Sequence, residues 1–566
     1  MIFNDIIFDL PITYCNDLHV LSKDVIDDLE LSNVIHSKVF HTTNQFGTHI
    51  SKEWCKYITS NTKFLEETQI VINNMKNFCS FPKTDTKRII EVWDDTKCNP
   101  VFLEKYNFID WEKFIYFNES PLFLQILSSV NVFSPIISLV IPIILLILPF
   151  FILQLRGDRI SFHEYLNILK VIISQQFFKG QNISGFGYDK IIYMIMYFGL
   201  YLMQMYQNIT TCNRFYNNIQ TVNQNLIDFK KFIEEISKKM ILFVELNKSR
   251  YYDSFCGKIN QHLLIIQEFY NKLNKLTPFE CNIRKLNDFG YLLSSYYELK
   301  NNHILHKSLC FSIGFDGYLD NLSCLYYHIE NGLMMHATFD TNIKNSFVAK
   351  EQIYPPHVLL PNAVKNSVDL KKNIIITGPN ASGKTTFLKT TAINIILSQQ
   401  FSCGFYKKCV INPFSSIHSY LNIPDTSERD SLFQAETRRC KNILDTINDS
   451  PTGSRHFCIF DELYTGTDAT SSSKASYSLL VYLCRRQNVS FMLTTHYKNV
   501  CKKLRRFKSK DKKRIIQNFQ MDVNEDETGL KYLYKIKKGI STVNGAIYIL
   551  KEMKYPDEII SEFINY

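Results

Sequence analysis

The chain has 566 residues, of which 45% are apolar, so it is long enough to form two to four domains with packed cores. Its net charge of +10 is modest for this length and does not by itself identify a nucleic-acid partner. The 15 cysteines show no C-x-x-C or metal-type spacing, which excludes a disulfide-stapled secreted scaffold and favours a reducing, cytosolic setting.

Residues 1–120 predict a helical N-terminal region. The first residues, "MIFNDIIFDLP", mix acidic with apolar side chains and contain no basic segment, so we expect no secretory leader. The stretch from Phe46 to Met75 has amphipathic spacing, which favours helices.

Residues 121–213 predict an apolar hairpin. Val132–Leu155 contains 24 residues without a charge, which is long enough to cross a bilayer. Ile191–Asn208 is a second uncharged stretch, made more amphipathic by its tyrosines and glutamine. Two interpretations stay open. One is a buried insert; the other, which we favour, is membrane association through residues 132–208, with both flanking parts of the chain in the cytosol.

Prolines favour the membrane interpretation. They recur every seven residues in the first apolar stretch, at Pro135, Pro142 and Pro149. Prolines at this spacing kink soluble helices, whereas membrane helices tolerate them. Beyond the hairpin, residues 214–345 predict long helices, in patterns such as "NQNLIDFKKFIEEISKKMILFVEL".

Residues 346–566 predict an α/β domain with a phosphate-binding loop. The stretch "IITGPNASGKTTFLK" fits G-x-x-x-x-G-K-[ST] without a mismatch, between an apolar β-branched strand and a helical pattern. Backbone N–H groups at a helix start face phosphates in such loops. We expect the loop to bind ATP through Gly378, Pro379, Asn380, Ala381, Ser382, Gly383, Lys384, Thr385 and Thr386.

Three side chains with catalytic chemistry follow two further apolar strands. Asp461 and Glu462 end the strand in "RHFCIFDEL", and His496 ends the one in "SFMLTTHY". Ligands collect at the carboxyl ends of parallel strands. We expect Thr385 and Asp461 to position Mg²⁺, Glu462 to activate water, and Lys384 and His496 to contact the γ-phosphate.

A basic run from Lys498 to Arg514 holds ten of the Lys and Arg residues and one acid. Such a run can bind nucleic-acid phosphates, and it is more often a solvated loop. Both alternatives stay open, so DNA contact through this run is one of two interpretations.

The order of these motifs resembles the MutS family of DNA mismatch repair ATPases, within the ABC-ATPase superfamily. The resemblance covers about residues 350–566 and includes the stretches "TGPNASGKTT", "DELYTGTDAT" and "TTHYKNV". Between the first and second of the predicted strands, Ser431, Phe433 and Glu436 match the family's Ser, aromatic and Glu positions. No L-S-G-G-Q stretch and no set of about six spans is present, which excludes a transporter ATPase.

The resemblance implies a fold, a cofactor and partners. The fold is a C-terminal α/β P-loop ATPase domain of ABC/MutS type, preceded by an α-helical core and lever domain. The activity is Mg²⁺-dependent ATP hydrolysis in a homodimer or heterodimer, with Ser431 completing the partner's site in trans. DNA is the expected partner, on the cytoplasmic or nuclear side. In the lead-in stretch, Val358, Leu359 and Leu360 stand where the family often has an aromatic residue against adenine.

The mismatch-recognition domain of the family is not visible. The strings of the form F-x-E at Phe64, Phe102 and Phe243 lack the family's context, and the residues before the core-like stretch at Phe46 are too few for that domain. We therefore predict a divergent member. Two functions remain: a DNA-acting ATPase in repair or recombination, or a membrane-tethered ATPase without mismatch recognition.

Overall fold

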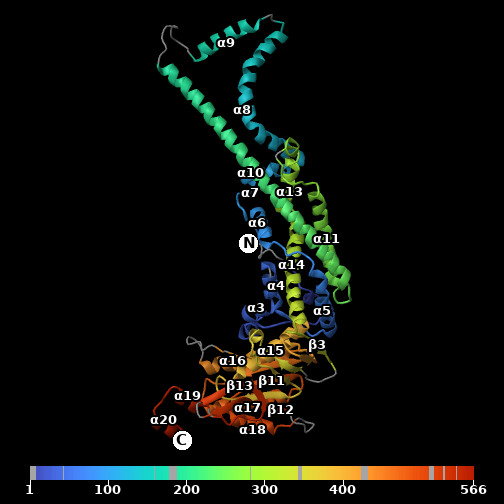
Figure 1. The fold of residues 1–566 in the computed structure, drawn as a ribbon, viewed down its shortest axis with the longest axis vertical. Coiled ribbons are helices and arrows are strands. Elements are labelled where there is room, and N and C mark those ends of the chain that lie inside the picture. The colour runs from blue at the N-terminus through green and yellow to red at the C-terminus, as the bar shows by residue number, and fades with distance from the viewer. Residues whose placement is uncertain are drawn as a thin grey trace. The chain divides into compact units, whose positions relative to one another are not determined.

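The computed structural model divides the chain into two compact units (Figure 1). One consists chiefly of Lys87–Glu235 and Leu264–Ser308; the other contains Phe3–Thr86, Ile236–Leu263 and Leu309–Tyr566. Each unit combines segments that are far apart in the sequence. The predicted domains are continuous stretches, so these units do not test their boundaries, which stay a prediction. The structure describes residues 8–42, 44–157, 160–177, 188–280, 282–341, 347–421, 423, 431–508, 515–526, 529–543 and 545–565.

The first unit is built from helices. They are α6 (Thr86–Trp93), η4 (Asp94–Cys98), α7 (Phe102–Lys105), η5 (Glu112–Glu119), α8 (Pro121–Leu155), α9 (Phe162–Phe177), α12 (Ile283–Leu286) and α13 (Phe289–Asn301). Three longer helices are divided between the two units: α10 (Tyr188–Asn247), α11 (Asp253–Leu273) and α14 (His303–Glu330). Helices therefore make up most of the predicted helical range 214–345 as far as Glu330, whereas Met335–Phe339 is a strand.

Two of these helices continue over long stretches of the sequence. Helix α8 continues for 35 residues through all three of its internal prolines. Helix α10 runs for 60 residues and passes the predicted boundary at residue 213 without a break. Among the described helices, α8 is long and apolar enough to cross a membrane.

The N-terminal end of α8 packs closely on α13. A Cβ at Gly290 would lie 2.2 Å from the carbonyl oxygen of Pro121, so only glycine permits this approach. The Gln125 side chain closes the contact, because its oxygen accepts from the Gly290 N–H at 2.9 Å and its Nε2 donates to the Leu286 carbonyl at 2.7 Å.

The second unit begins with short elements around a two-stranded antiparallel sheet, β1 with β2. The order is η1 (Pro11–Tyr14), β1 (Leu18–Val20), α2 (Lys23–Asp28), η2 (Leu31–Ile35), α3 (His36–Val39), α4 (Gln45–Trp54), β2 (Tyr57–Thr59), α5 (Thr62–Asn74) and η3 (Met75–Phe78). The predicted helical stretch from Phe46 to Met75 is thus helical at both ends, with β2 between α4 and α5.

Two larger sheets form the C-terminal part of this unit. The five-stranded sheet has the order β5-β4-β8-β3-β7, with β3 (Met335–Phe339), β4 (Phe347–Gln352), β5 (Asn366–Asp369), β7 (Cys403–Gly404) and β8 (Lys408–Ile411). The six-stranded sheet has the order β13-β12-β6-β11-β10-β9, with β6 (Asn373–Thr377), β9 (Ser416–Tyr420), β10 (His456–Asp461), β11 (Val489–Thr494), β12 (Ile516–Asp526) and β13 (Gly529–Lys538).

The remaining elements of this part are helical. They are η6 (Pro355–His357), α15 (Lys384–Phe401), α16 (Leu432–Asp449), α17 (Ala469–Cys484), α18 (Lys498–Arg505), α19 (Gly545–Glu552) and α20 (Asp557–Asn565). Figure 1 shows α15 on one side of the six-stranded sheet and α17 and α18 on the other.

The six-stranded sheet aligns the ends of three parallel strands. Asp461 of β10 is level with Thr494 of β11, and Thr494 is level with Ile376 of β6. These strands are fully apolar in their middles because helices cover both faces of the sheet. Residues that follow the three strands therefore meet at one edge.

Helix α15 lies between the two larger sheets and contacts strands of both, as well as α5. Almost all of its side chains are buried, including the apolar residues that predicted it. Its buried polar groups are paired: Gln399 donates to the Phe414 carbonyl at 2.7 Å and to the Thr59 carbonyl at 3.1 Å. These bonds fix the helix that begins at the glycine loop.

Candidate functional site

The glycine loop, residues 378–383, joins β6 to α15 and bends through two left-handed residues. Gly383 has φ of 92° and Ala381 has φ of 60°. A Cβ on Gly383 would lie 3.1 Å from the Tyr534 ring, so glycine is required there by both backbone and space. The Ser382 hydroxyl donates to the Pro379 carbonyl at 2.7 Å and closes the loop. The first N–H groups of α15 are thereby presented to an anion.

Lys384 is the first residue of α15, and its side chain is almost fully buried. Its Nζ donates to the carbonyls of Gly378 and Pro379 at 3.1 and 3.0 Å. Burial lowers the pKa of Lys384, and the nearby charge of Glu462 opposes this shift. A buried ammonium held by loop carbonyls is best stabilised by an anion placed in the loop.

Thr385 and Asp461 meet across the strand ends. The Thr385 hydroxyl donates to Asp461 Oδ2 at 2.8 Å, and the Thr494 hydroxyl donates to Oδ1. Hydroxyl and carboxylate oxygens are ligands that Mg²⁺ accepts. Within the described ranges, no three or more His, Cys, Asp or Glu side chains gather as a metal cluster. A magnesium ion here would therefore take further ligands from a phosphate or from water.

Glu462 and His496 form the next pair. His496 Nε2 lies 3.0 Å from Glu462 Oε1, and Lys384 Nζ lies 4.0 Å from the same oxygen. The hydrogen bond from His496 is the main cause that holds the pKa of Glu462 below its usual value. Both side chains are partly exposed, so water can reach the carboxylate.

The structure therefore brings together five of the predicted side chains: Lys384, Thr385, Asp461, Glu462 and His496. Their roles in binding and catalysis stay predictions.

Ser431 is placed differently. It is an exposed N-cap of α16, in a capping box with Gln434: the Ser431 hydroxyl accepts from Gln434 N–H at 3.4 Å, and Gln434 Oε1 accepts from Ser431 N–H at 3.0 Å. The contacts described for Ser431 thus lie within its own helix. The residues just before it, 422 and 424–430, lie outside the described part of the chain.

Glu436, predicted from the same segment, is buried and connects α16 to the turn after Glu462. Its carboxylate accepts from Thr465 N–H at 2.9 Å, Thr465 Oγ1 at 2.8 Å and Gly466 N–H at 3.1 Å. A Cβ on Gly466 would lie 2.6 Å from the backbone nitrogen of Phe433, so the two segments touch. The turn that carries Glu462 is therefore fastened to the start of α16.

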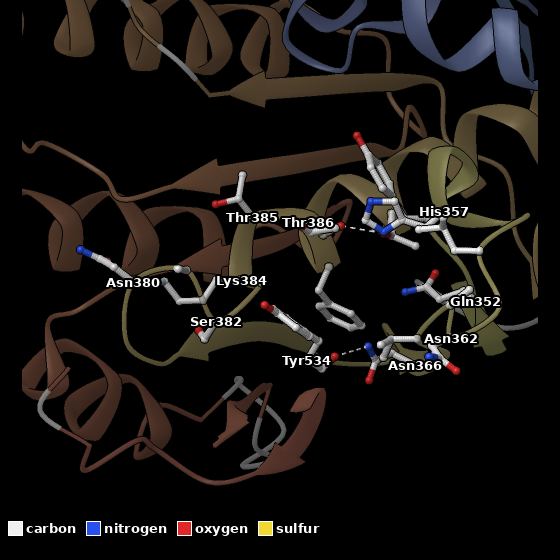
Figure 2. A pocket seen from close by; sticks show the side chains of 18 of the residues that line it. Gln352, His357, Asn362, Asn366, Asn380, Ser382, Lys384, Thr385, Thr386 and Tyr534 are labelled. Atoms are coloured by element: carbon white, nitrogen blue, oxygen red, sulfur yellow. Dashed lines mark hydrogen bonds between the residues drawn. The ribbon is translucent and has the colours of Figure 1, made fainter. Parts of the chain in front are cut away.

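A pocket of about 630 Å³ opens beside the glycine loop (Figure 2). On the loop side it is lined by residues 380–387, and opposite them by Tyr354, His357, Leu360 and Tyr534. The Asn366 side chain holds β13 in place there, because it donates to the Tyr534 carbonyl at 2.9 Å and accepts from the Ile536 N–H at 3.0 Å. The volume is in the range of small-molecule sites.

A second, smaller pocket of about 360 Å³ lies next to the other part of the loop. Its lining includes Gly378, Pro379, Asn380, His496 and Ser541. All nine predicted loop residues thus line one pocket or the other.

Sequence reasoning missed the aromatic side of the larger pocket. It placed Val358, Leu359 and Leu360 where an aromatic residue was expected, and of these Leu360 lines the pocket. Tyr534 comes from β13, about 150 residues after the loop, and reaches the site because β12 pairs with both β6 and β13. No local pattern around Tyr534 could have identified it.

These features define an α/β domain with a mostly parallel sheet and an anion-type loop at the carboxyl ends of its parallel strands. The family model described as MutS domain V matches residues 374–565, which contain the loop, both carboxylates and His496. The C-terminal part of the chain is therefore similar to MutS domain V, in agreement with the predicted resemblance to the MutS family.

Several curated proteins named DNA mismatch repair protein MutS are similar to this chain. The protein of Persephonella marina is 28% identical over 232 residues, which are 40% of this chain and 25% of the relative. That of Leuconostoc mesenteroides is 26% identical over 43% of the chain and 28% of the relative. That of Prochlorococcus marinus is 29% identical over 34% and 20%. The chain matches about a quarter of the length of these relatives.

Proposed function

We propose that the chain is a Mg²⁺-dependent ATPase with a P-loop ATPase domain of ABC/MutS type. One observation carries the proposal: a buried lysine, a threonine–aspartate pair and a glutamate–histidine pair converge at one glycine loop. Phosphoryl transfer needs little more than such positioning and charge stabilisation.

Each side chain then has a distinct role. Residues 378–386 cradle the phosphates, and the Lys384 ammonium exchanges its loop carbonyls for phosphate oxygens. Thr385 and Asp461 hold Mg²⁺, which when bound neutralises phosphate charge. Glu462 accepts a proton from the attacking water, and His496 orients Glu462 and contacts the γ-phosphate.

The larger pocket supports a site for the base. Tyr534 and the Tyr354–His357 ring pair, with centroids 5.1 Å apart, offer aromatic surfaces beside the loop. A planar base in this pocket would stack on such rings. We propose Tyr534 as the base contact in place of the aromatic residue missing at 358–360.

The relatives' printed name favours DNA as the partner and mismatch repair as the process. We propose a role on DNA in repair or recombination, on the cytoplasmic or nuclear side. We propose an ATP-gated homodimer or heterodimer in which Ser431 of one subunit completes the site of the other. The proposal assigns a mismatch-reading role to none of the residues named here.

A second candidate function is a membrane-tethered ATPase without mismatch recognition. The observation that favours it is α8, whose side chains from 132 to 155 are all partly or fully exposed although none is charged.

Two variants of the full chain test the ATPase proposal. Lys384→Ala removes a charge-assisted phosphate contact and should weaken ATP binding about 10- to 100-fold. Glu462→Gln should bind ATP as the wild type does and hydrolyse it about 10²- to 10⁴-fold more slowly. The control is Lys372→Ala, an exposed lysine just before β6, which should behave as the wild type. Wild-type turnover by Glu462→Gln would refute the proposed role of this carboxylate.

A further inference from the structure

We propose that α8 and the uncharged stretch Ile191–Asn208 of α10 insert into a lipid bilayer as a hairpin. The inference deepens the membrane-tethered candidate and does not depend on ATP hydrolysis. It begins from exposure: Leu145 of α8 is 63% exposed, as are many of its apolar neighbours, and none of the side chains from 132 to 155 is buried. An uncharged helix of 24 residues is ~36 Å long, which covers the ~30 Å hydrocarbon core of a bilayer.

Helix α10 forms the second arm of the hairpin. Tyr201 OH donates to the Ser138 carbonyl at 3.5 Å, and Cys212 Sγ donates to the Val132 carbonyl at 3.3 Å. The later residue of α8 pairs with the earlier residue of α10, so the two helices are antiparallel where they touch. The outward side chains of this part of α10 are apolar and exposed, among them Ile195, Phe198 and Leu202.

Prolines give the strongest argument. Each proline in α8 lacks an N–H, so the carbonyl four residues earlier loses its helical donor. For Pro135 this is the Asn131 carbonyl, which accepts from the Ser134 hydroxyl at 3.1 Å. For Pro142 it is the Ser138 carbonyl, which accepts from Tyr201.

Helix α9 also donates to the backbone of α8 near the third proline. Pro149 frees the Leu145 carbonyl, and Tyr165 OH of α9 donates to the next carbonyl, that of Leu146, at 2.6 Å. In water these carbonyls would need no protein donor. In hydrocarbon every backbone polar group must be satisfied by the protein, and side chains of α8 and α10 meet this need at Pro135 and Pro142.

The fold of the second unit restricts how many times the chain can cross the membrane. Segments before and after the hairpin fold together in that unit: His36 Nε2 lies 3.3 Å from Gln400 Oε1, and Gln399 donates to the Thr59 carbonyl. Both segments must therefore lie on one side of the membrane, so the chain crosses an even number of times. Charged residues flank the two uncharged stretches in the sequence, with Lys113 and Arg156 around the first and Lys190 and Arg214 around the second.

The test uses the full chain with vesicles of phosphatidylcholine and phosphatidylglycerol, floated through a density gradient at alkaline pH. Inserted protein floats with the lipid. We expect the wild type and Leu264→Arg, which changes an exposed leucine on α11, to float, and Leu145→Arg to lose most of its flotation. Protein that stays in the load as a soluble oligomer, or sinks as an aggregate, would overturn the proposal.

Trypsin added outside the vesicles then tests the topology. A two-span hairpin predicts a protected fragment from Phe114 to Arg214 that is cut at Arg156 and Lys170 only after detergent is added. Cleavage at Arg156 without detergent would contradict insertion. ATP binding, measured on the same samples, should depend on Lys384 and not on Leu145, so failure of the hairpin is distinguishable from failure of the ATPase site.

Discussion

Glu462 occupies a backbone conformation that few residues other than glycine adopt. Its φ is 50°, directly after β10, and its N–H donates to the Thr494 carbonyl at 3.1 Å. Left-handed backbone at such a residue costs free energy and persists where the surrounding structure over-determines it. The turn brings the carboxylate within 3.0 Å of His496 and 4.0 Å of Lys384. The position of this carboxylate is thus fixed by the backbone, and its ionisation by its two neighbours.

His496 should therefore set the pH range in which Glu462 works. The His496 hydrogen bond favours the ionised form of Glu462, so His496→Ala should raise the pKa of Glu462. Because the proposed base must be ionised, the acid limb of the ATPase pH profile should move to higher pH. The measurement is kcat against pH for the wild type and the variant.

The control keeps the hydrogen bond. His496→Gln can still donate to Glu462 through its amide and should restore the acid limb toward that of the wild type. If His496→Ala lowers kcat at every pH without moving the acid limb, His496 does not act through the ionisation of Glu462.

At the scale of elements, α16 connects the segment that begins at Ser431 to the catalytic turn. Its capping box fixes the first turn, and buried Glu436 holds Thr465 and Gly466 through three hydrogen bonds. A displacement of the start of α16 would therefore be transmitted to the turn that carries Glu462. The hydrogen bonds of Glu436 thus connect the proposed partner contact at Ser431 to the proposed base.

Substitution can separate the cap of α16 from the proposed role in trans. Ser431→Gly removes the hydroxyl and should cost only a few tenths of a kcal/mol in stability, because glycine is tolerated at N-caps. If the hydroxyl completes the partner's site, hydrolysis should still fall about 10²-fold. Gln434→Ala breaks the capping box and leaves the Ser431 hydroxyl in place.

The two variants are compared by thermal melting and by steady-state ATPase assays over a range of protein concentrations. The role in trans predicts slow hydrolysis for Ser431→Gly alone, with little loss of stability. Equal hydrolysis by Ser431→Gly and the wild type would leave Ser431 as a helix cap only.

The local elements of the site could be predicted because each is encoded in a short stretch. The apolar strand before Gly378, the strand that ends at Asp461 and the strand before His496 are continuous buried runs, and all three appear in the sheet. Their ends meet because parallel strands in one sheet share an edge. The carboxylate, hydroxyl and imidazole contacts follow from this alignment.

Features that depend on distant pairing could not be predicted in this way. Tyr534 enters the pocket through the pairing of β13 with β12, which no pattern around it records. The Ser138 carbonyl that Pro142 frees in α8 accepts from Tyr201, a residue of another helix. Sequence periodicity describes one element at a time, and these contacts join two.

For the whole molecule, buried imidazoles tie folding stability to pH. His36 is fully buried; its Nδ1 lies 2.9 Å from the Ser51 carbonyl and its Nε2 3.3 Å from Gln400 Oε1. Burial lowers the pKa of His36 from 6.5 to about 4. Burial also lowers the pKa of His418 and of His456. His418 Nε2 lies 3.1 Å from His456 Nδ1. All three shifts therefore have the same sign.

The sign of the effect on stability follows from the pH at which the folded chain and the unfolded chain each take up a proton. Below pH 6.5 the unfolded chain protonates at His36, while the folded chain stays neutral there until about pH 4. Stability is therefore lost as the pH falls from 6.5 to about 4, and the loss levels off below that. At 1.36 kcal/mol per pH unit, His36 alone contributes a loss of about 3 kcal/mol across this window.

Urea unfolding of the full chain between pH 4 and 7 measures this loss of stability. His36→Gln, which keeps an amide that can hydrogen-bond, should flatten this dependence, whereas His303→Gln, which changes an exposed imidazole on α14, should not. An unchanged slope in His36→Gln would mean that other groups carry the acid sensitivity of the fold.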